Sequence, residues 1–171
     1  MNRVAFLSLV LPMTFTMVYL FGKQPKKPSK QYRKVVKKSI ADTRKVVEGP
    51  ADTEMDSVMN LLDAMIQVES RGNASAVGDE HLGSPSVGVL QIRPIMVKEV
   101  NRILKKCNES KTYELDDRYS RDKSIAMFQI WKAYYHNHST LEKIARCWNG
   151  GPRGYKMNAT IHYWNKVKAY L

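Results

Sequence analysis

The stretch DAMIQVESRGNASAVGDE, residues 63–80, places a carboxylate on the apolar face of a predicted helix. Apolar residues recur at helical spacing from Val58 to Met65, and Glu69 continues their stripe four positions after Met65. Gly72 then supplies the left-handed stop that commonly ends a helix. Burying an ionised carboxylate without a partner is costly, so the position of Glu69 requires either a structural or a chemical reason.

Two interpretations of Glu69 follow from its position. In the first, it is a core carboxylate satisfied by backbone donors or by an arginine. In the second, the helix dipole and the apolar stripe disfavour the ionised form and raise the pKa of Glu69. A carboxylic acid that stays protonated near neutral pH can act as a general acid, which is the group that cleavage of a glycosidic bond requires.

The 171 residues divide into three predicted segments. Residues 4–21 carry no charge and are about long enough to span a membrane. Because no small-residue cleavage site follows, residues 1–22 are predicted to be an uncleaved membrane anchor, with a cleaved export signal as the alternative. The Lys-rich residues 23–50 are predicted to be a basic linker, and residues 51–171 a single domain.

The net charge of +12 belongs mostly to the N-terminal arm. Residues 1–50 contain 11 Lys and Arg against 2 Asp and Glu, whereas residues 51–171 contain 17 against 14. The linker is therefore either a solubilising arm or a contact for anionic lipid or an anionic polymer. No specific nucleic-acid binding is expected of the domain, which lacks a basic stripe interleaved with aromatic residues.

The domain is predicted to be mainly α with one small β-hairpin. Helix starts are expected at Thr53, at Pro94 and at a capping box of Ser139 with Glu142, and the segment SVGVLQI, residues 86–92, suits a short strand or hairpin. The apolar faces expected in the core after residue 93 are Met96, Val100, Ile103, Leu104 and Cys107; Ile125, Phe128, Trp131 and Tyr135; Leu141, Ile144, Ala145 and Trp148; and Ile161, Trp164, Val167 and Leu171.

The cysteines and histidines do not form a metal-binding pattern. Cys107 and Cys147 are forty residues apart with no zinc-type cluster, and two separate buried thiols are favoured over a single disulfide. His136 and His138 are at the wrong spacing for a metal pair on one helical face and are predicted to be solvated. No metal and no cofactor are expected.

Three motifs occur in a characteristic order: ESRGN at residues 69–73, VGVLQI at 87–92 and ARCWNGGPRG at 145–154. Together they resemble the soluble lytic transglycosylase family of the lysozyme-like superfamily, whose pattern runs Glu-Ser-x-x-Asn, Gly-Leu-Met-Gln and Ala-Tyr-Asn-x-Gly. The resemblance covers about residues 58–168. It implies a lysozyme-like domain that follows the N-terminal hydrophobic helix.

The resemblance also implies roles for individual residues. Glu69 matches the catalytic acid, and the substrate-binding positions correspond to Ser70, Asn73, Gln91, Trp148 and Asn149. Trp148 stands where the family usually has Tyr, which puts in doubt any role that needs a phenol hydroxyl. A tryptophan still offers a face for a sugar ring, with plain core packing as the equal alternative.

Asp79 decides the type of reaction. In an inverting hydrolase a second carboxylate activates water, and Asp79 is the possible second carboxylate, with a solvated loop acid as the favoured alternative. The transglycosylases need no such group, because the 6-hydroxyl of the sugar closes on the anomeric carbon and leaves an anhydro end. The sequence leaves open whether the enzyme is a hydrolase or a transglycosylase.

The implied function is peptidoglycan cleavage at the MurNAc-GlcNAc bond, with glycan strands as partner. The alternative is a catalytically inactive glycan-binding protein or a virion or envelope structural protein with the same fold. The expected location is the cell envelope, membrane-anchored through residues 4–21 or exported, in a phage lysis protein or a bacterial wall enzyme. The Lys-rich linker conflicts with export under the positive-inside rule, and the oligomeric state stays open.

Overall fold

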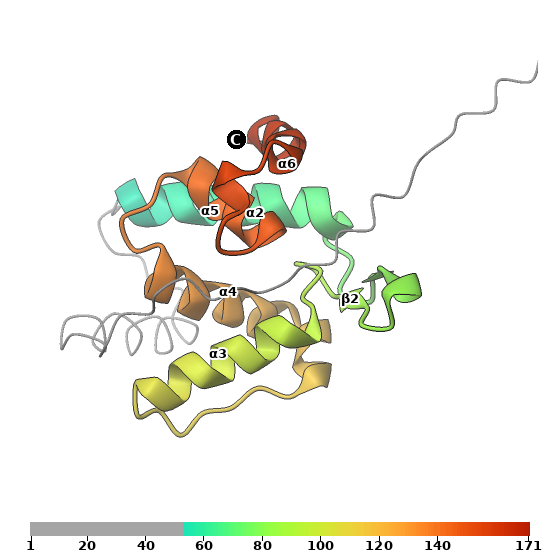
Figure 1. Ribbon diagram of the computed structural model, residues 1–171, viewed down its shortest axis with the longest axis vertical. Coiled ribbons are helices and arrows are strands. Elements are labelled where there is room, and N and C mark those ends of the chain that lie inside the picture. Colours follow the sequence, from blue (N-terminus) through green and yellow to red (C-terminus); the bar gives the residue numbers. More distant parts are fainter. Residues whose placement is uncertain (1–52) are drawn as a thin grey trace, which may run out of the picture.

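The computed structural model describes residues 53–171, which form five α-helices, three short 3₁₀ helices and one two-stranded antiparallel hairpin (Figure 1). The predicted mainly α fold with a small hairpin is confirmed for this part of the chain. In chain order the elements are α2 (Thr53–Ser70), β1 (Val77–Gly78), η1 (Glu80–Leu82), β2 (Ser86–Val87), α3 (Pro94–Lys106), η2 (Leu115–Tyr119), α4 (Arg121–Tyr135), α5 (Leu141–Gly150), η3 (Gly154–Lys156) and α6 (Ala159–Lys168).

Residues 1–52 lie outside the described part of the chain. The predicted anchor at residues 1–22 and the basic linker at residues 23–50 therefore stay predictions. From residue 53 onward, none of the helices is both long enough and apolar enough to cross a bilayer.

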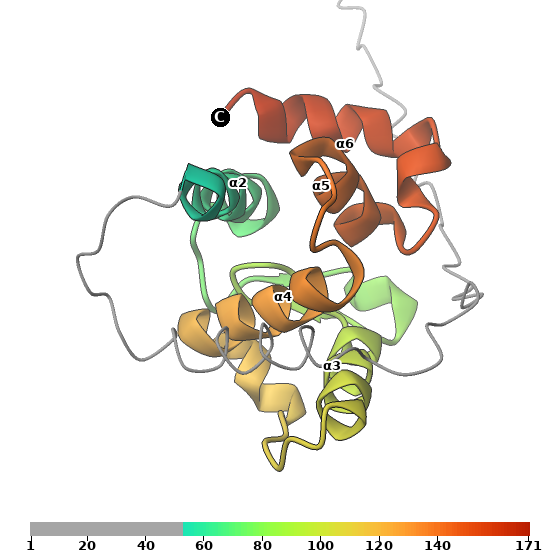
Figure 2. The same cartoon turned by 90° about the vertical axis from the view of Figure 1, so that its left-hand side faces the viewer.

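Helix α2 forms one layer together with α5 and α6 (Figure 2). Helices α5 and α6 lie against it, and α4 and α3 form a second layer below (Figures 1 and 2). Leu61, Leu62, Met65 and Ile66 of α2 are almost completely buried, which confirms the apolar stripe that leads to Glu69. The helix ends at Ser70, and the backbone at Gly72 has the left-handed φ of 81° that the sequence predicted for its stop.

The second layer follows the sequence pattern except at Tyr135 of α4, which was predicted to be buried but is 36% exposed and donates its hydroxyl to Glu99 of α3. Pro94 is the first residue of α3, where its missing N–H leaves no hydrogen bond unmade. All five residues expected on the apolar face of this segment, from Met96 to Cys107, are buried. Cys107 and Cys147 are both buried and unpaired with each other, so the prediction of two separate thiols is confirmed.

The start of α5 was predicted one residue too early. Thr140, not Ser139, is the N-cap, and its hydroxyl accepts a hydrogen bond from the Lys143 N–H at 3.3 Å. Ser139 instead contacts the Nδ1 atom of His136 at 3.1 Å. Since both residues are good caps, their hydroxyls are interchangeable in a sequence pattern, and the contact with His136 decides between them.

His136 is buried rather than solvated, which corrects the sequence prediction. Its ring lies 4.6 Å from the Trp131 ring, centroid to centroid, and burial lowers the pKa of His136 to about 4. The neutral ring that results packs like an aromatic residue. Trp131 itself meets Trp148 edge-on at 5.1 Å, so the histidine extends an aromatic cluster at the centre of the domain.

The face that α6 buries agrees with the predicted one at Val167 and at the partly buried Trp164, but not at Ile161 and Leu171. Ile161 and Leu171 are 40% and 51% exposed, while Thr160, Tyr163 and Val167 are buried. Polar hydroxyls on this face obscured the pattern. The Thr160 hydroxyl is satisfied inside the fold, where it bonds to the carbonyl oxygens of Gly154 at 2.7 Å and Met157 at 2.8 Å, and a satisfied hydroxyl can be buried at little cost.

The hairpin is held in place by side chains rather than by long strands. Strands β1 and β2 pair Val77 with Val87 and Gly78 with Ser86, a ladder of only two residues each. Buried Arg118 of η2 reaches across and donates to the carbonyl oxygens of Pro85 and Ile92, each at 3.1 Å. A guanidinium supplies five donors in a fixed geometry, so one arginine can fix several loop carbonyls at once.

Gly88 allows the close approach between the hairpin and η2. Its φ is 78°, and a Cβ at this position would collide with the carbonyl oxygen of Arg118. Gly72, with φ of 81°, has open space in the same direction. Substitution at Gly72 would therefore cost only the strain of a left-handed backbone, whereas substitution at Gly88 would add steric overlap.

Gly88→Ala is expected to destabilise the domain more than Gly72→Ala. Both variants bear the cost of a left-handed alanine, about 1–2 kcal/mol. Gly88→Ala adds the clash with the Arg118 carbonyl, typically about 1–3 kcal/mol for an overpacked site. Urea denaturation of both variants checks this, and equal losses would show that the hairpin relaxes away from η2 without strain.

Candidate active site

Glu69 lies in the last turn of α2 and is partly buried. The hydroxyl of Tyr163 on α6 donates a hydrogen bond to Glu69 Oε1 at 2.8 Å. Burial raises the pKa of Tyr163 well above its ordinary value, so the phenol keeps its proton and acts as the donor. The predicted carboxylate on the apolar stripe thus has a single neutral donor, which comes from the last helix of the chain, and no arginine neutralises it.

The pKa of Glu69 is raised from 4.5 to about 7. Burial is the main cause, because it penalises the charged form. The Tyr163 hydrogen bond works in the opposite direction, and the negative charge of Asp79 adds to the rise. The upward shift predicted from the sequence is confirmed, and a large share of the carboxyl groups is protonated at neutral pH.

Asp79 directly follows β1 in the hairpin and is exposed. Its backbone has φ of 56°, in the left-handed region that few residues other than glycine adopt. The Ser86 hydroxyl lies 3.3 Å from Asp79 Oδ2. Because the Asp79 charge contributes to the pKa of Glu69, the two carboxyl groups are electrostatically coupled.

Ser70 and Asn73, two of the predicted substrate-binding residues, have hydrogen-bonding roles within the fold. The Ser70 hydroxyl donates to the Val89 carbonyl oxygen at 2.9 Å and so ties the end of α2 to the segment after the hairpin. Exposed Asn73 accepts a hydrogen bond from the Ser75 N–H at 2.9 Å through its side-chain oxygen, which shapes the turn after the helix. Contact of either residue with substrate stays a prediction.

The side chain of Gln91 holds the two sides of the hairpin together by hydrogen bonds, and we call it the clamp of the hairpin. Its side-chain Nε2 donates to the carbonyl oxygens of Ala76 at 3.2 Å and Gly88 at 3.0 Å, while its Oε1 faces Ser86 Oγ at 3.0 Å. The resemblance implied that this glutamine faces substrate. Both amide hydrogens are already used inside the hairpin, so Oε1 is the atom with remaining capacity.

Trp148 and Asn149 lie next to each other in α5 but in different environments. Trp148 is 9% exposed and packs edge-on against Phe128 at 5.3 Å, so its ring has the core-packing role that the sequence gave as the alternative. Asn149 is exposed. Stacking of a sugar on Trp148 remains a prediction that rests on the motif resemblance alone.

Sequence reasoning missed Tyr163, the residue that contacts Glu69 directly. The available signal was the spacing Thr160, Tyr163 and Val167, three and four residues apart on one helical face. Ile161, Trp164 and Leu171 made a more apolar stripe with the same period. A phenol hydroxyl does contact Glu69, but it comes from α6 and not from the position of Trp148 in α5.

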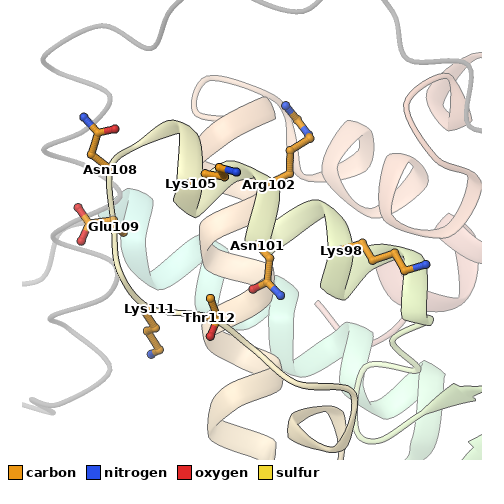
Figure 3. Close-up of a pocket in the computed structure, with 8 residues that line it drawn as sticks. All are labelled: Lys98, Asn101, Arg102, Lys105, Asn108, Glu109, Lys111 and Thr112. Atoms are coloured by element: carbon orange, nitrogen blue, oxygen red, sulfur yellow. The ribbon is translucent and has the colours of Figure 1, made fainter.

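A pocket of about 610 Å³ lies away from these residues, on α3 and the loop that follows it (Figure 3). None of the predicted site residues lines it, and basic side chains predominate. Asn101 of α3 joins the loop to the helix, because its side-chain amide donates to the carbonyl oxygen of Tyr113 and accepts from the N–H of Tyr113, each at 2.8 Å. Within residues 53–171 no three His, Cys, Asp or Glu side chains gather as metal ligands would.

The helical fold and the small hairpin beside Glu69 define a lysozyme-like protein. Invertebrate-type lysozyme 6 of Caenorhabditis elegans is 31% identical over 118 residues, which cover 64% of this chain and 83% of that relative. The chain belongs to the invertebrate-type lysozyme family. No family model matches it.

A solved structure agrees with the fold. A chain in the crystal structure of Aeromonas hydrophila PliI in complex with Meretrix lusoria lysozyme is 25% identical, with a TM-score of 0.52. The match covers 64% of this chain and 87% of that one. The predicted lysozyme-related fold is confirmed at this level, whereas the narrower assignment to the soluble lytic transglycosylases finds no support in either match.

Tyr163→Phe is expected to raise the pKa of Glu69 above about 7, because the lost hydrogen bond favours the ionised carboxylate. A ¹³C NMR titration of the glutamate carboxyl carbons measures the change. Tyr170→Phe is the matched control, since Tyr170 is 61% exposed and lies just beyond the same helix. A Glu69 pKa that falls, or that shifts equally in both variants, would contradict the contact between Tyr163 and Glu69.

Proposed function

We propose that this protein is a lysozyme-type glycosidase that cleaves peptidoglycan between N-acetylmuramic acid and N-acetylglucosamine, with Glu69 as general acid. The observation that carries the proposal is the pKa of about 7 at a partly buried carboxyl with one neutral donor. A general acid works best when its pKa lies near the working pH. Membership in the invertebrate-type lysozyme family supports the same class of reaction.

The hydrogen bond from Tyr163 assigns different roles to the two oxygens of Glu69. Oε1 accepts the phenol hydrogen, which leaves Oε2 to carry the transferable proton. As the glycosidic oxygen takes that proton, negative charge develops on the carboxylate, and the Tyr163 donor stabilises it. Burial keeps Glu69 protonated before the reaction, and with a pKa of about 7 the carboxyl is still a far better proton donor than water.

Asp79 is the second carboxylate in this proposal. It is exposed to solvent on the hairpin and lies near enough to Glu69 for its charge to raise the pKa of that carboxyl. There it activates a water molecule or stabilises the positive charge of the sugar. The transglycosylase route, in which the 6-hydroxyl of the sugar attacks, is the alternative within the same class.

The substrate places the domain at the cell envelope. The apolar residues 4–21 would anchor or export it, and the basic linker at residues 23–50 would contact anionic polymers of the wall or membrane. Ser70, Asn73, Gln91 and Asn149 would line the path of the glycan. No cofactor is needed for this chemistry.

Glu69→Gln is expected to lower the rate of wall cleavage by about 10²- to 10⁴-fold, because the amide keeps the shape but has no acidic proton to transfer. Turbidity loss of purified cell wall measures the rate, and Glu80→Gln, an exposed acid two residues after β1, is the control. Activity of Glu69→Gln within a few-fold of wild type would overturn the assignment. A wild-type chain that binds the wall without cleaving it would favour the inactive glycan-binding alternative.

The same variant separates catalysis from folding. The folded protein holds the Glu69 proton up to a pKa of about 7, whereas the unfolded chain releases it near 4.5. The native state therefore binds more protons between these values, and wild-type stability falls as the pH rises from about 4.5 through 7. Glu69→Gln lacks this loss and should be as stable as wild type or more stable at pH 8, as thermal unfolding at pH 4 and pH 8 will show.

Asp79→Asn distinguishes the two routes. In a hydrolase the variant loses about 10²- to 10⁴-fold in rate, and mass spectrometry of the wild-type muropeptides shows reducing ends. Anhydro ends with a nearly unchanged rate in Asp79→Asn would identify a lytic transglycosylase instead. The Glu80→Gln control shows whether loss of any hairpin carboxylate has the same effect.

A further inference from the structure

The side chains of Asp79 and Gln91, which come from different parts of the hairpin region, both contact the hydroxyl of Ser86. Its Oγ lies 3.0 Å from Gln91 Oε1 and 3.3 Å from Asp79 Oδ2. Ser86 is 5% exposed in strand β2, whereas Asp79 is at the surface. A buried hydroxyl thus connects the exposed carboxylate to the clamp of the hairpin.

The orientation of Gln91 in this group is fixed by its other partners. Its Nε2 is within hydrogen-bonding distance of the carbonyl oxygens of Ala76 and Gly88, which are both acceptors. Turning the amide over would place its oxygen against both carbonyls. The oxygen of Gln91 must therefore face Ser86, and this contact can be a hydrogen bond only when Ser86 is the donor.

Ser86 has one hydroxyl proton for two acceptor oxygens. A proton directed to Gln91 leaves the Asp79 carboxylate without that donor, and a proton directed to Asp79 leaves Gln91 Oε1 unmatched. Hydrogen bonds to a charged acceptor are roughly twice as strong as neutral ones, which favours Asp79 in spite of the longer distance. The position of the Asp79 carboxylate and the hydrogen bonding of Gln91 are therefore linked.

Both partners of Ser86 have an unusual backbone conformation. Asp79 and Gln91 have φ of 56° and 46°, both left-handed and both at non-glycine residues. Gly78, next to Asp79, is also required, because a Cβ there would collide with Gln91 Oε1 and would lie 3.0 Å from Ser86 Oγ. A left-handed backbone at a non-glycine residue is costly and persists only where surrounding contacts hold it in place.

We infer that Ser86 is a positioning residue, whose shared hydroxyl proton holds the Asp79 carboxylate in the orientation that serves the reaction and couples it to Gln91. This inference rests on the proposed role of Asp79 as second carboxylate. Ser86 itself does not touch the substrate. Its effect on the rate passes entirely through Asp79.

A double-mutant cycle tests this pathway. Ser86→Ala should lower kcat by about 10-fold, the usual effect of losing a hydrogen bond to a charged group, with KM nearly unchanged. In the Asp79→Asn background the same change should alter kcat less than about two-fold, because no catalytic carboxylate is left to position. An equal loss in both backgrounds would overturn the inference and make Ser86 a structural residue.

Ser124→Ala is the matched control. Ser124 is completely buried, and its hydroxyl donates at 2.8 Å to the Arg118 carbonyl oxygen, which packs against Gly88 of the same hairpin. The variant therefore tests whether loss of any buried hydrogen bond next to the hairpin lowers kcat. Both serine variants should lose some thermal stability, since each removes one buried hydrogen bond. Only Ser86→Ala should lose kcat at a temperature where both variants are folded, and a similar loss in Ser124→Ala would contradict the inference.

A readout without turnover separates the inference from the proposed function. The ¹⁵N NMR signal of the Gln91 side-chain amide should shift on Asp79→Asn, and this shift should disappear in the Ser86→Ala background. A shift that persists without Ser86, or no shift at all, would overturn the coupling. Coupling in a protein that leaves cell wall intact would show that the proposed glycosidase activity is wrong while the Ser86 link holds.

Discussion

The hydrogen bond from Tyr163 to Glu69 is the contact on which the candidate site depends. It joins the first described helix, α2, to the last, α6, across 94 positions of the chain. Without it, the burial that raises the pKa of Glu69 would leave the carboxyl with no donor for its developing charge. The buried face of α6 includes Thr160, whose hydroxyl bonds to the Gly154 carbonyl oxygen, and packing of this face brings the Tyr163 hydroxyl to Glu69.

Side chains replace strand length in the hairpin. Each strand has two residues, too few for a ladder that is stable in water, so Arg118, Gln91 and Ser70 supply hydrogen bonds to loop carbonyls. Gly88 lets η2 approach the hairpin, because a side chain there would collide with the Arg118 carbonyl oxygen. Two non-glycine residues of the same region, Asp79 and Gln91, have a left-handed backbone. A carboxylate on such a loop keeps its position because several independent contacts fix the loop.

The sequence predicted the elements that apolar periodicity controls. The stripe of α2, the position of Glu69 at its end and the face of α3 were all confirmed, because burial of aliphatic side chains determines each of them. The strand or hairpin predicted at residues 86–92 was found in part: only Ser86–Val87 is a strand, and it pairs with Val77–Gly78. The misses share a different cause. At Tyr163, Thr160 and His136 a polar group is buried because a hydrogen-bond partner satisfies it, and the period of the apolar residues does not reveal that partner. The partner lies 94 positions away for Tyr163, but only six away for Thr160 and three away for His136. For the same reason Ser86 escaped notice, although its neighbours Gln91 and Asp79 were both singled out.

The contact between the two ends of the domain has a consequence for the order of synthesis. The ribosome makes α2 early and α6 late, so a growing chain carries Glu69 long before Tyr163 is available to it. Until α6 emerges and docks, α2 lacks one of the surfaces that bury its final turn, and the carboxyl there behaves as an ordinary acid in water. The general acid of the proposed reaction would thus be complete only when the last helix had folded onto the first.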